Sequence, residues 1–220
     1  MEGLLVVVLV VAVGIAVVYA LHRYEQQRRA AAIALAHQRG YQIEVADKPP
    51  PDLPFDVFEI GSSRRVSYQI WRPGSHDSAF QYRYATGSGK NRQTHKRSCT
   101  LVEIPFDAPH LVIGPEGFWS AIGKVIGFRD IEVESPQFNS RYRVRCADER
   151  FAITLLDAPM IAWMLTTQSG GGTVTFELGG RWMLCWGDRL EFAQLFGFLE
   201  WAQHARTNLP TVLTSLYPPT

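Results

Sequence analysis

An uninterrupted apolar run near the start of the chain constrains its architecture more than any other feature. Residues 4–21 read LLVVVLVVAVGIAVVYAL and contain no charged residue. A helix needs about 17–25 apolar residues to cross the hydrocarbon core of a bilayer. The sequence therefore predicts a transmembrane helix over residues 1–21, followed by a chain polar enough to form a water-soluble domain.

The charges on either side of this run predict its orientation. Glu2 precedes it, whereas the juxtamembrane basic residues Arg23, Arg28 and Arg29 follow it. The positive-inside rule then places the N-terminus outside and the domain in the cytoplasm. We expect a single-pass protein of the plasma membrane with the lipid bilayer as its partner. A cleaved signal peptide is the alternative, although such a peptide begins with a basic region that this chain lacks.

A stripe of small residues lies within the predicted span. Ala12, Ala16 and Ala20 recur every four residues and therefore share one helix face. Small residues let two membrane helices approach closely, so this face could support self-association. The alternative is that alanine is simply common in such helices.

Composition divides the rest of the chain into segments. Residues 22–40 are alanine-rich and predict a juxtamembrane helical stalk that stops at Gly40. Residues 41–54 form a Pro-rich connector in which no regular helix can run. A globular domain is expected over residues 55–206, and residues 207–220 read as a loose C-terminal tail.

The hydrophobic pattern of the domain predicts the α+β class, with a mainly antiparallel sheet and packed helices. We expect one strand, over residues 94–104, to end at Pro105 and Pro109. Acidic Asp130, Glu132 and Glu134 alternate in one predicted strand, and basic Arg141, Arg143 and Arg145 alternate in a strand that would pair with it. Further predictions are a helix over residues 118–128, helix caps at Ser135, Asp148 and Asp157, and a hairpin over residues 173–186 that turns at Gly179-Gly180.

Motifs for catalysis are weak. Residues 87–90 read GSGK, but Tyr84 stands where a phosphate-binding loop needs its first glycine, and Asn91 replaces the hydroxyl that would hold magnesium. The three cysteines form no CxxC pair and are expected as buried small hydrophobes. We predict no catalytic residue, no metal site and no cofactor, and the balance favours a protein that is not an enzyme.

Basic residues crowd one predicted hairpin. Lys90, Arg92, Lys96 and Arg97 lie at or near its glycine-rich tip. Cytoplasmic leaflets are anionic, so a tethered domain could rest this tip on lipid headgroups. A solvated loop is the alternative. The net charge of +1 gives no support to nucleic acid as a partner.

Two stretches, residues 81–95 and 114–152, carry an unusual order of glycine hairpin, acidic strand, Phe-Asn turn and basic strand. In this order the chain resembles an uncharacterised bacterial family of single-span membrane proteins with a domain of unknown function. The resemblance implies the same architecture and carries over no catalytic residue.

Three hypotheses follow for the function. The first is a membrane-anchored interaction or scaffold domain with an unidentified protein partner and without catalysis. The second is a peripheral domain that senses lipid or another phosphoanion through the hairpin of residues 87–97. The third is an enzyme whose reaction the sequence does not indicate.

Overall fold

The computed structural model describes residues 2–115, 129–167 and 173–219, apart from the side chains of residues 2–8 and of Arg129. Among these residues, seven strands form one antiparallel sheet in the order β1-β2-β3-β4-β6-β5, with β7 paired to β4. The α+β class is thus confirmed. The strands are β1 (Gln42–Glu44), β2 (Ser62–Trp71), β3 (Ser78–Thr86), β4 (Gln93–Pro115), β5 (Arg129–Ile131), β6 (Tyr142–Cys146) and β7 (Thr175–Asp188).

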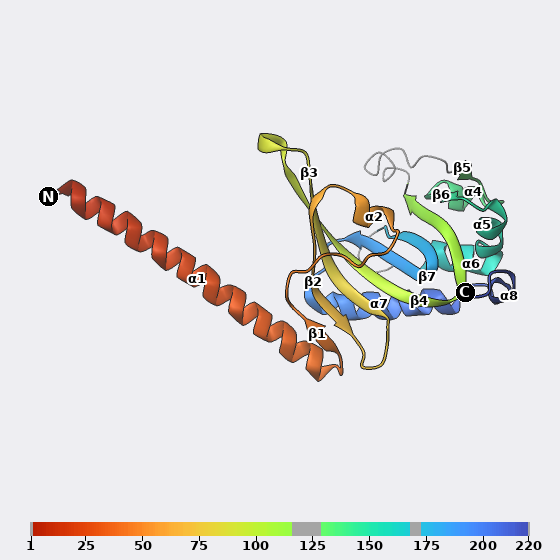
Figure 1. Ribbon diagram of the computed structural model, residues 1–220, viewed down its shortest axis with the longest axis horizontal. Helices are drawn as coiled ribbons and strands as arrows, with labels where there is room; N and C mark the ends of the chain where they lie inside the picture. Colours follow the sequence, from red (N-terminus) through yellow and green to blue (C-terminus); the bar gives the residue numbers. More distant parts are fainter. Residues whose placement is uncertain (1, 116–128, 168–172, 220) are drawn as a thin grey trace.

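Helices cover both faces of the sheet. The α7 helix runs along one face, and the short α2 lies on the other (Figure 1). The helices are α1 (Glu2–Gln38), α2 (Asp56–Glu59), α4 (Pro136–Asn139), α5 (Glu149–Leu155), α6 (Ala158–Thr166), α7 (Leu195–Thr207) and α8 (Val212–Leu216), with short 3₁₀ turns η1 (Gly89–Asn91) and η3 (Phe192–Gln194).

The α1 helix joins the predicted span and the predicted stalk in one element. It projects away from the domain and ends where Gly40 takes a φ of +75°, as the stop signal predicts (Figure 1). No helix within the described residues is both long and apolar enough to cross a membrane. This part of the chain therefore does not confirm the transmembrane helix predicted over residues 1–21.

The two longest strands, β4 and β7, form a bent ribbon. The Nε1 of Trp186 donates a hydrogen bond of 2.7 Å to Glu177, although both residues belong to β7 and are nine positions apart. Nine residues of straight strand would separate them by about 30 Å. The strand must therefore bend sharply between them.

The bend explains why the hairpin predicted over residues 173–186 is wrong. Gly179 and Gly180 lie inside β7, where the pairing with β4 shifts register on both sides of the Ala108–Gly180 pair. Gly180 takes a φ of +56°, which glycine adopts without steric cost. The two glycines therefore serve a β-bulge instead of a hairpin turn.

The same bend accounts for the prolines of β4. The strand runs past Pro105 and Pro109, contrary to prediction. Its pairing with β3 ends at Leu101 and its pairing with β6 begins at Leu111, so only β7 accompanies the segment that contains both prolines. Proline lacks an N–H, and strands tolerate it where one ladder is missing or a bulge interrupts pairing.

Several local predictions are confirmed. The predicted pairing of an acidic with a basic strand is confirmed in part: Asp130 lies opposite Arg145 in the β5–β6 pair, and its carboxylate is 2.7 Å from the Arg145 Nε. Glu132 and Glu134 follow the end of β5, and Arg141 precedes β6. The side chains of Ser135, Asp148 and Asp157 accept hydrogen bonds from backbone N–H groups at the starts of α4, α5 and α6. The helix predicted over residues 118–128 lies outside the described residues.

The C-terminal residues, expected as a loose tail, are packed in the structure. They include α8, in which Leu213 is buried, and Tyr217 donates a hydrogen bond of 2.7 Å to Asp148. At the opposite end, residues 42–44 of the predicted connector form β1 at the edge of the sheet. The folded domain therefore includes chain from both sides of the domain predicted over residues 55–206.

Candidate functional site

The outer part of α1 exposes apolar side chains to an unusual degree. Val18 is 67% exposed, and Leu9, Val10 and Ile15 are exposed to a similar extent. The surfaces of soluble monomers rarely contain apolar patches of this extent unless they bind something. Ala12, Ala16 and Ala20 lie on the same exposed segment, and their role in self-association remains a prediction.

The inner end of α1 is fixed to the domain. Ala32 and Ala36 are buried against it. Just beyond the helix, Tyr41 packs edge-on against Phe196 of α7, with ring centroids 5.0 Å apart. The exposed apolar helix is therefore attached to the sheet through packed side chains as well as through the chain itself.

A pocket of about 260 Å³ opens where α1 passes the sheet. Charged side chains dominate its lining, and most of them are basic. The basic residues are Arg28 and Arg29 from α1, Arg83 from β3, Lys96 from β4, and Arg189 from the loop after β7; the acidic residues are Glu25 and Asp47. We refer to this site as the basic pocket.

Two of the five basic side chains have acidic partners within the basic pocket. Arg83 forms an ion pair with Asp47, and the Nε of Arg29 is 3.9 Å from the carboxylate of Glu25. Exposed pairs of this kind contribute about 0–1 kcal/mol each. Their main effect here is to offset two of the five positive charges.

The structure separates the four basic residues predicted to act together at the hairpin of residues 87–97. Lys90 lies in η1 at the tip, and Arg92 donates a hydrogen bond of 2.8 Å to Ser63. Lys96 and Arg97 are neighbours on β4 and therefore point to opposite faces. Lys96 lines the basic pocket, whereas Arg97 pairs with Asp188 and lies over the Trp186 ring.

The basic pocket instead combines residues from both predicted basic groups. Arg28 and Arg29 come from the juxtamembrane group and Lys96 from the hairpin group, whereas Arg23 remains exposed on α1 outside the pocket. Sequence reasoning missed Arg83 and Arg189. Arg83 lies on the polar face of β3, and this polar face was a signal for a binding residue. Nothing in the sequence indicates that the loop carrying Arg189 lies beside Arg83.

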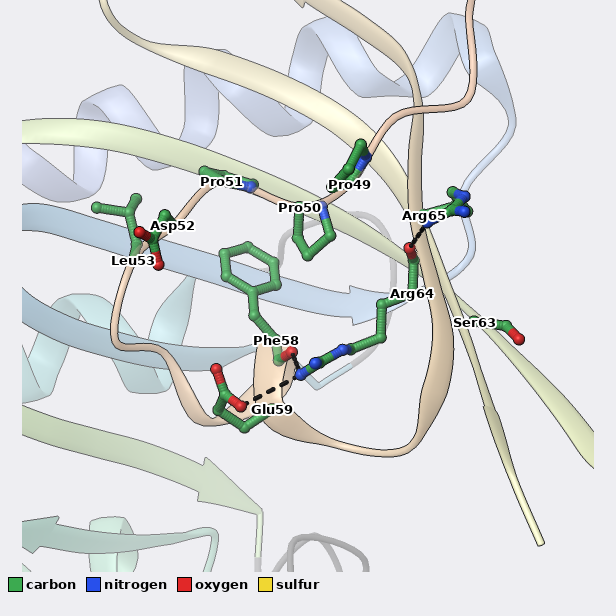
Figure 2. A pocket seen from close by; sticks show the side chains of 10 residues that line it. All are labelled: Pro49, Pro50, Pro51, Asp52, Leu53, Phe58, Glu59, Ser63, Arg64 and Arg65. Carbon is green, nitrogen blue, oxygen red and sulfur yellow. Dashed lines mark hydrogen bonds and ion pairs between the residues drawn. The ribbon is translucent and has the colours of Figure 1, made fainter. Parts of the chain in front are cut away.

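A second pocket, of about 480 Å³, lies between the proline connector and the start of β2 (Figure 2). Pro49, Pro50 and Pro51 line it together with Phe58, and Arg64 reaches across to Glu59. The Arg64 guanidinium also donates to the Phe58 carbonyl oxygen. These partners occupy one nitrogen of the guanidinium, and Arg64 thereby links the start of β2 to the end of α2.

Among the described residues, three side chains form a cluster inside the bent ribbon that could hold a cation. We refer to it as the buried cluster. One potential ligand atom each from Asp56, His110 and Glu177 lies within 4.8 Å of the others. Glu177 is fully buried, and its carboxylate accepts hydrogen bonds of 2.7 Å from the backbone N–H of Asp56 and from the Trp186 indole. These contacts tie the start of α2 to β7 and hold the two halves of the ribbon together, which gives Glu177 a structural role.

Burial shifts the pKa values of this cluster. It raises the pKa of Glu177 to about 8, and the nearby Asp56 adds to this effect. It also raises the pKa of Asp56 and lowers that of His110, because burial disfavours the charged form of each group. The cluster therefore binds protons more readily at its acids and less readily at its imidazole than the unfolded chain does.

The cysteines are free and buried, as predicted. Burial raises the pKa of Cys99, Cys146 and Cys185, which opposes formation of the reactive thiolate. These three thiols are therefore unsuited to nucleophilic catalysis.

Comparison with known proteins gives a likeness of fold. No family model matches this chain, and no curated protein is similar to it in sequence. A solved structure that resembles it is the crystal structure of the mycobacterial trehalose monomycolate transport factor A, TtfA. The two share 11% sequence identity with a TM-score of 0.55, over 86% of this chain and 95% of that one. At this identity the likeness shows a shared fold alone.

Proposed function

We propose that this protein is a membrane-attached interaction domain without catalytic activity of its own. The observation that carries the proposal is the exposed apolar segment of α1, residues 9–21, on a helix whose other end is packed into the domain. Transfer of such side chains from water to hydrocarbon is favourable by about 25 cal/mol per Å². The helix would hold the domain at a fixed place beside the bilayer.

Two further observations support a role in binding. The cysteines are buried, and Glu177 of the titratable cluster is enclosed and hydrogen-bonded. The fold is shared with a protein named as a transport factor, which agrees with an accessory role. The orientation with the domain in the cytoplasm is part of the proposal, because Arg23, Arg28 and Arg29 follow the apolar segment.

Flotation with vesicles of phosphatidylcholine alone tests the attachment, because these vesicles carry no net charge. The wild-type full chain should float with them. Changing Val13 and Val17 together to Lys should reduce the bound fraction at least tenfold, since a Lys in hydrocarbon costs about 3 kcal/mol.

The matched control changes two exposed alanines of the same helix, Ala30→Lys and Ala34→Lys, outside the apolar segment. It adds the same charge and should float like the wild type. Equal flotation of the Val13/Val17 variant and the wild type would show that the apolar segment is not the attachment.

A further inference from the structure

The charges of the basic pocket do not balance. Its five basic and two acidic side chains leave an excess of three positive charges, and the two acids are already paired with Arg29 and Arg83. The side chains of Arg28, Lys96 and Arg189 form no hydrogen bond or ion pair with another described residue. Three cations therefore converge on one pocket without an acidic partner in the described part of the chain.

The fold holds the backbone beside Arg189 in a defined position. The next residue, Leu190, is buried; its N–H donates a hydrogen bond of 2.9 Å to the Ser98 hydroxyl, and its carbonyl accepts one of 3.2 Å from Gln81. Ser98 and Gln81 are themselves buried and lie opposite each other on β4 and β3. Two buried polar side chains thus fix the loop that brings Arg189 to the pocket.

The sheet brings two positive charges together, of which Asp47 offsets one. Lys96 lies directly opposite Arg83 in the β3–β4 pair, and like charges at directly opposed positions destabilise a sheet. Tyr68, which also lines the pocket, has a φ of +52° at a register shift in β2. Such backbone strain in residues other than glycine concentrates at functional sites.

The pocket also lies near the headgroups of an attached membrane. Arg28 comes seven residues after Leu21, the last residue of the apolar segment, which is about 10 Å along a helix. The headgroup layer on each side of the hydrocarbon core is about 5–8 Å thick. The backbone of Arg28 would therefore lie a few ångströms outside this layer, a gap that its long side chain can span to reach lipid phosphates.

We infer that the basic pocket binds a phosphate group through Arg28, Lys96 and Arg189. Phosphate carries several acceptor oxygens and a negative charge, and an arginine guanidinium can donate two parallel hydrogen bonds to it. The shared chemistry is that of a phosphate ester, either the headgroup of an anionic phospholipid or a free phosphate monoester. The lipid source rests on the proposed membrane attachment, whereas the pocket itself does not.

The first experiment uses a soluble probe, so it does not depend on membrane attachment. Glycerol 3-phosphate is titrated by calorimetry into the full chain in a neutral detergent. Changing Arg28, Lys96 and Arg189 together to Gln should weaken binding at least tenfold. The matched control, Lys90, Arg92 and Arg150 together to Gln, removes the same charge at exposed positions outside the pocket and should bind like the wild type.

The second experiment identifies the source of the phosphate. Native mass spectrometry of the full chain, released from micelles that contain equal amounts of phosphatidylglycerol and phosphatidylcholine, should show preferential retention of phosphatidylglycerol. The pocket variant should lose this preference and the control should keep it. Phosphatidylcholine also contains phosphate but has no net charge, so the comparison isolates the anionic headgroup.

The outcomes separate the two proposals. In one outcome, the wild type binds phosphate, the pocket variant loses this binding, and the wild-type chain fails to float with phosphatidylcholine vesicles. This outcome would support the pocket as a site for a free phosphate monoester and would overturn the membrane attachment. Equal loss in the control variant, or undiminished binding by the pocket variant in both experiments, would overturn the pocket. A pocket variant that melts at the temperature of the wild type shows that any loss arises from the site and not from unfolding.

Discussion

Two regions of the molecule bring charged residues together from distant parts of the chain: the buried cluster of Asp56, His110 and Glu177, and the basic pocket. The surroundings of the charged groups differ between these two regions. In the cluster, Glu177 is fully enclosed and backbone and indole N–H groups donate to it. In the basic pocket, Lys96 and Arg189 are exposed and like charges are opposed. The enclosed and hydrogen-bonded Glu177 stabilises the fold, whereas the open and unbalanced charges of the basic pocket are available to a ligand.

The largest expected effect follows from Glu177→Ala. The substitution leaves the Trp186 indole and the Asp56 N–H without their buried acceptor, so the free energy of unfolding should fall by about 3 kcal/mol. Urea denaturation followed by tryptophan fluorescence measures this change. The exposed Glu132→Ala provides the control, with an expected change within about 0.5 kcal/mol. Equal effects of the two substitutions would contradict a structural role for the cluster.

Stability should also depend on pH through Glu177. Its pKa is raised from 4.5 to about 8, so the folded state holds the proton more tightly than the unfolded chain does. The stabilisation from this group is therefore present at low pH and is lost as the pH rises between these two values. Glu177→Gln cannot titrate, and its unfolding free energy relative to the wild type should rise across this range. A difference between the two proteins that is independent of pH would refute the assignment.

The bend that creates the cluster can be tested at its glycine. Gly180→Ala places a side chain at a φ of +56° and should lower the free energy of unfolding by about 1–2 kcal/mol. Gly197→Ala in α7 is the matched control, because a Cβ there meets nothing within 4 Å. Alanine favours a helix interior, so this control should raise stability by about 0.5–1 kcal/mol. Thermal melts of the two variants should therefore shift in opposite directions.

The smallest expected effect on stability belongs to the basic pocket. Changing Arg28, Lys96 and Arg189 together to Gln should alter the free energy of unfolding by less than about 1 kcal/mol, since no described residue loses a partner. Relief of the repulsion between Lys96 and Arg83 could make the change favourable. A large loss of stability would show that these cations serve the fold, and would remove the contrast with the buried cluster.

Local features were predictable because short-range chemistry decides them. Ser135, Asp148 and Asp157 accept hydrogen bonds at helix starts a few residues away, and Asp130 meets Arg145 across one short strand pair. The stop of α1 at Gly40 belongs to the same group. Each of these depends on neighbours in sequence or on a single local pairing.

Predictions failed where the neighbouring strand lies far away in the sequence. Gly179-Gly180 is typical of a hairpin turn, but β7 pairs along its whole length with β4, so the glycines form a bulge. Pro105 and Pro109 would end an ordinary strand, but here they lie where one ladder is absent. Local propensity cannot predict which strand a residue pairs with, because the tertiary structure decides that pairing.

The sequence by itself determined the apolar segment of residues 4–21, the basic residues that follow it, the α+β class and the helix caps, because all of these are patterns of composition or of near neighbours. Only the tertiary structure decided which charges share a site. It separated Lys96 from Arg97 by the alternation of a strand and joined Lys96 to Arg28 and Arg189 across three elements. The physical reason is that α1, the β3–β4 ladder and the loop after β7 meet only when the sheet has formed.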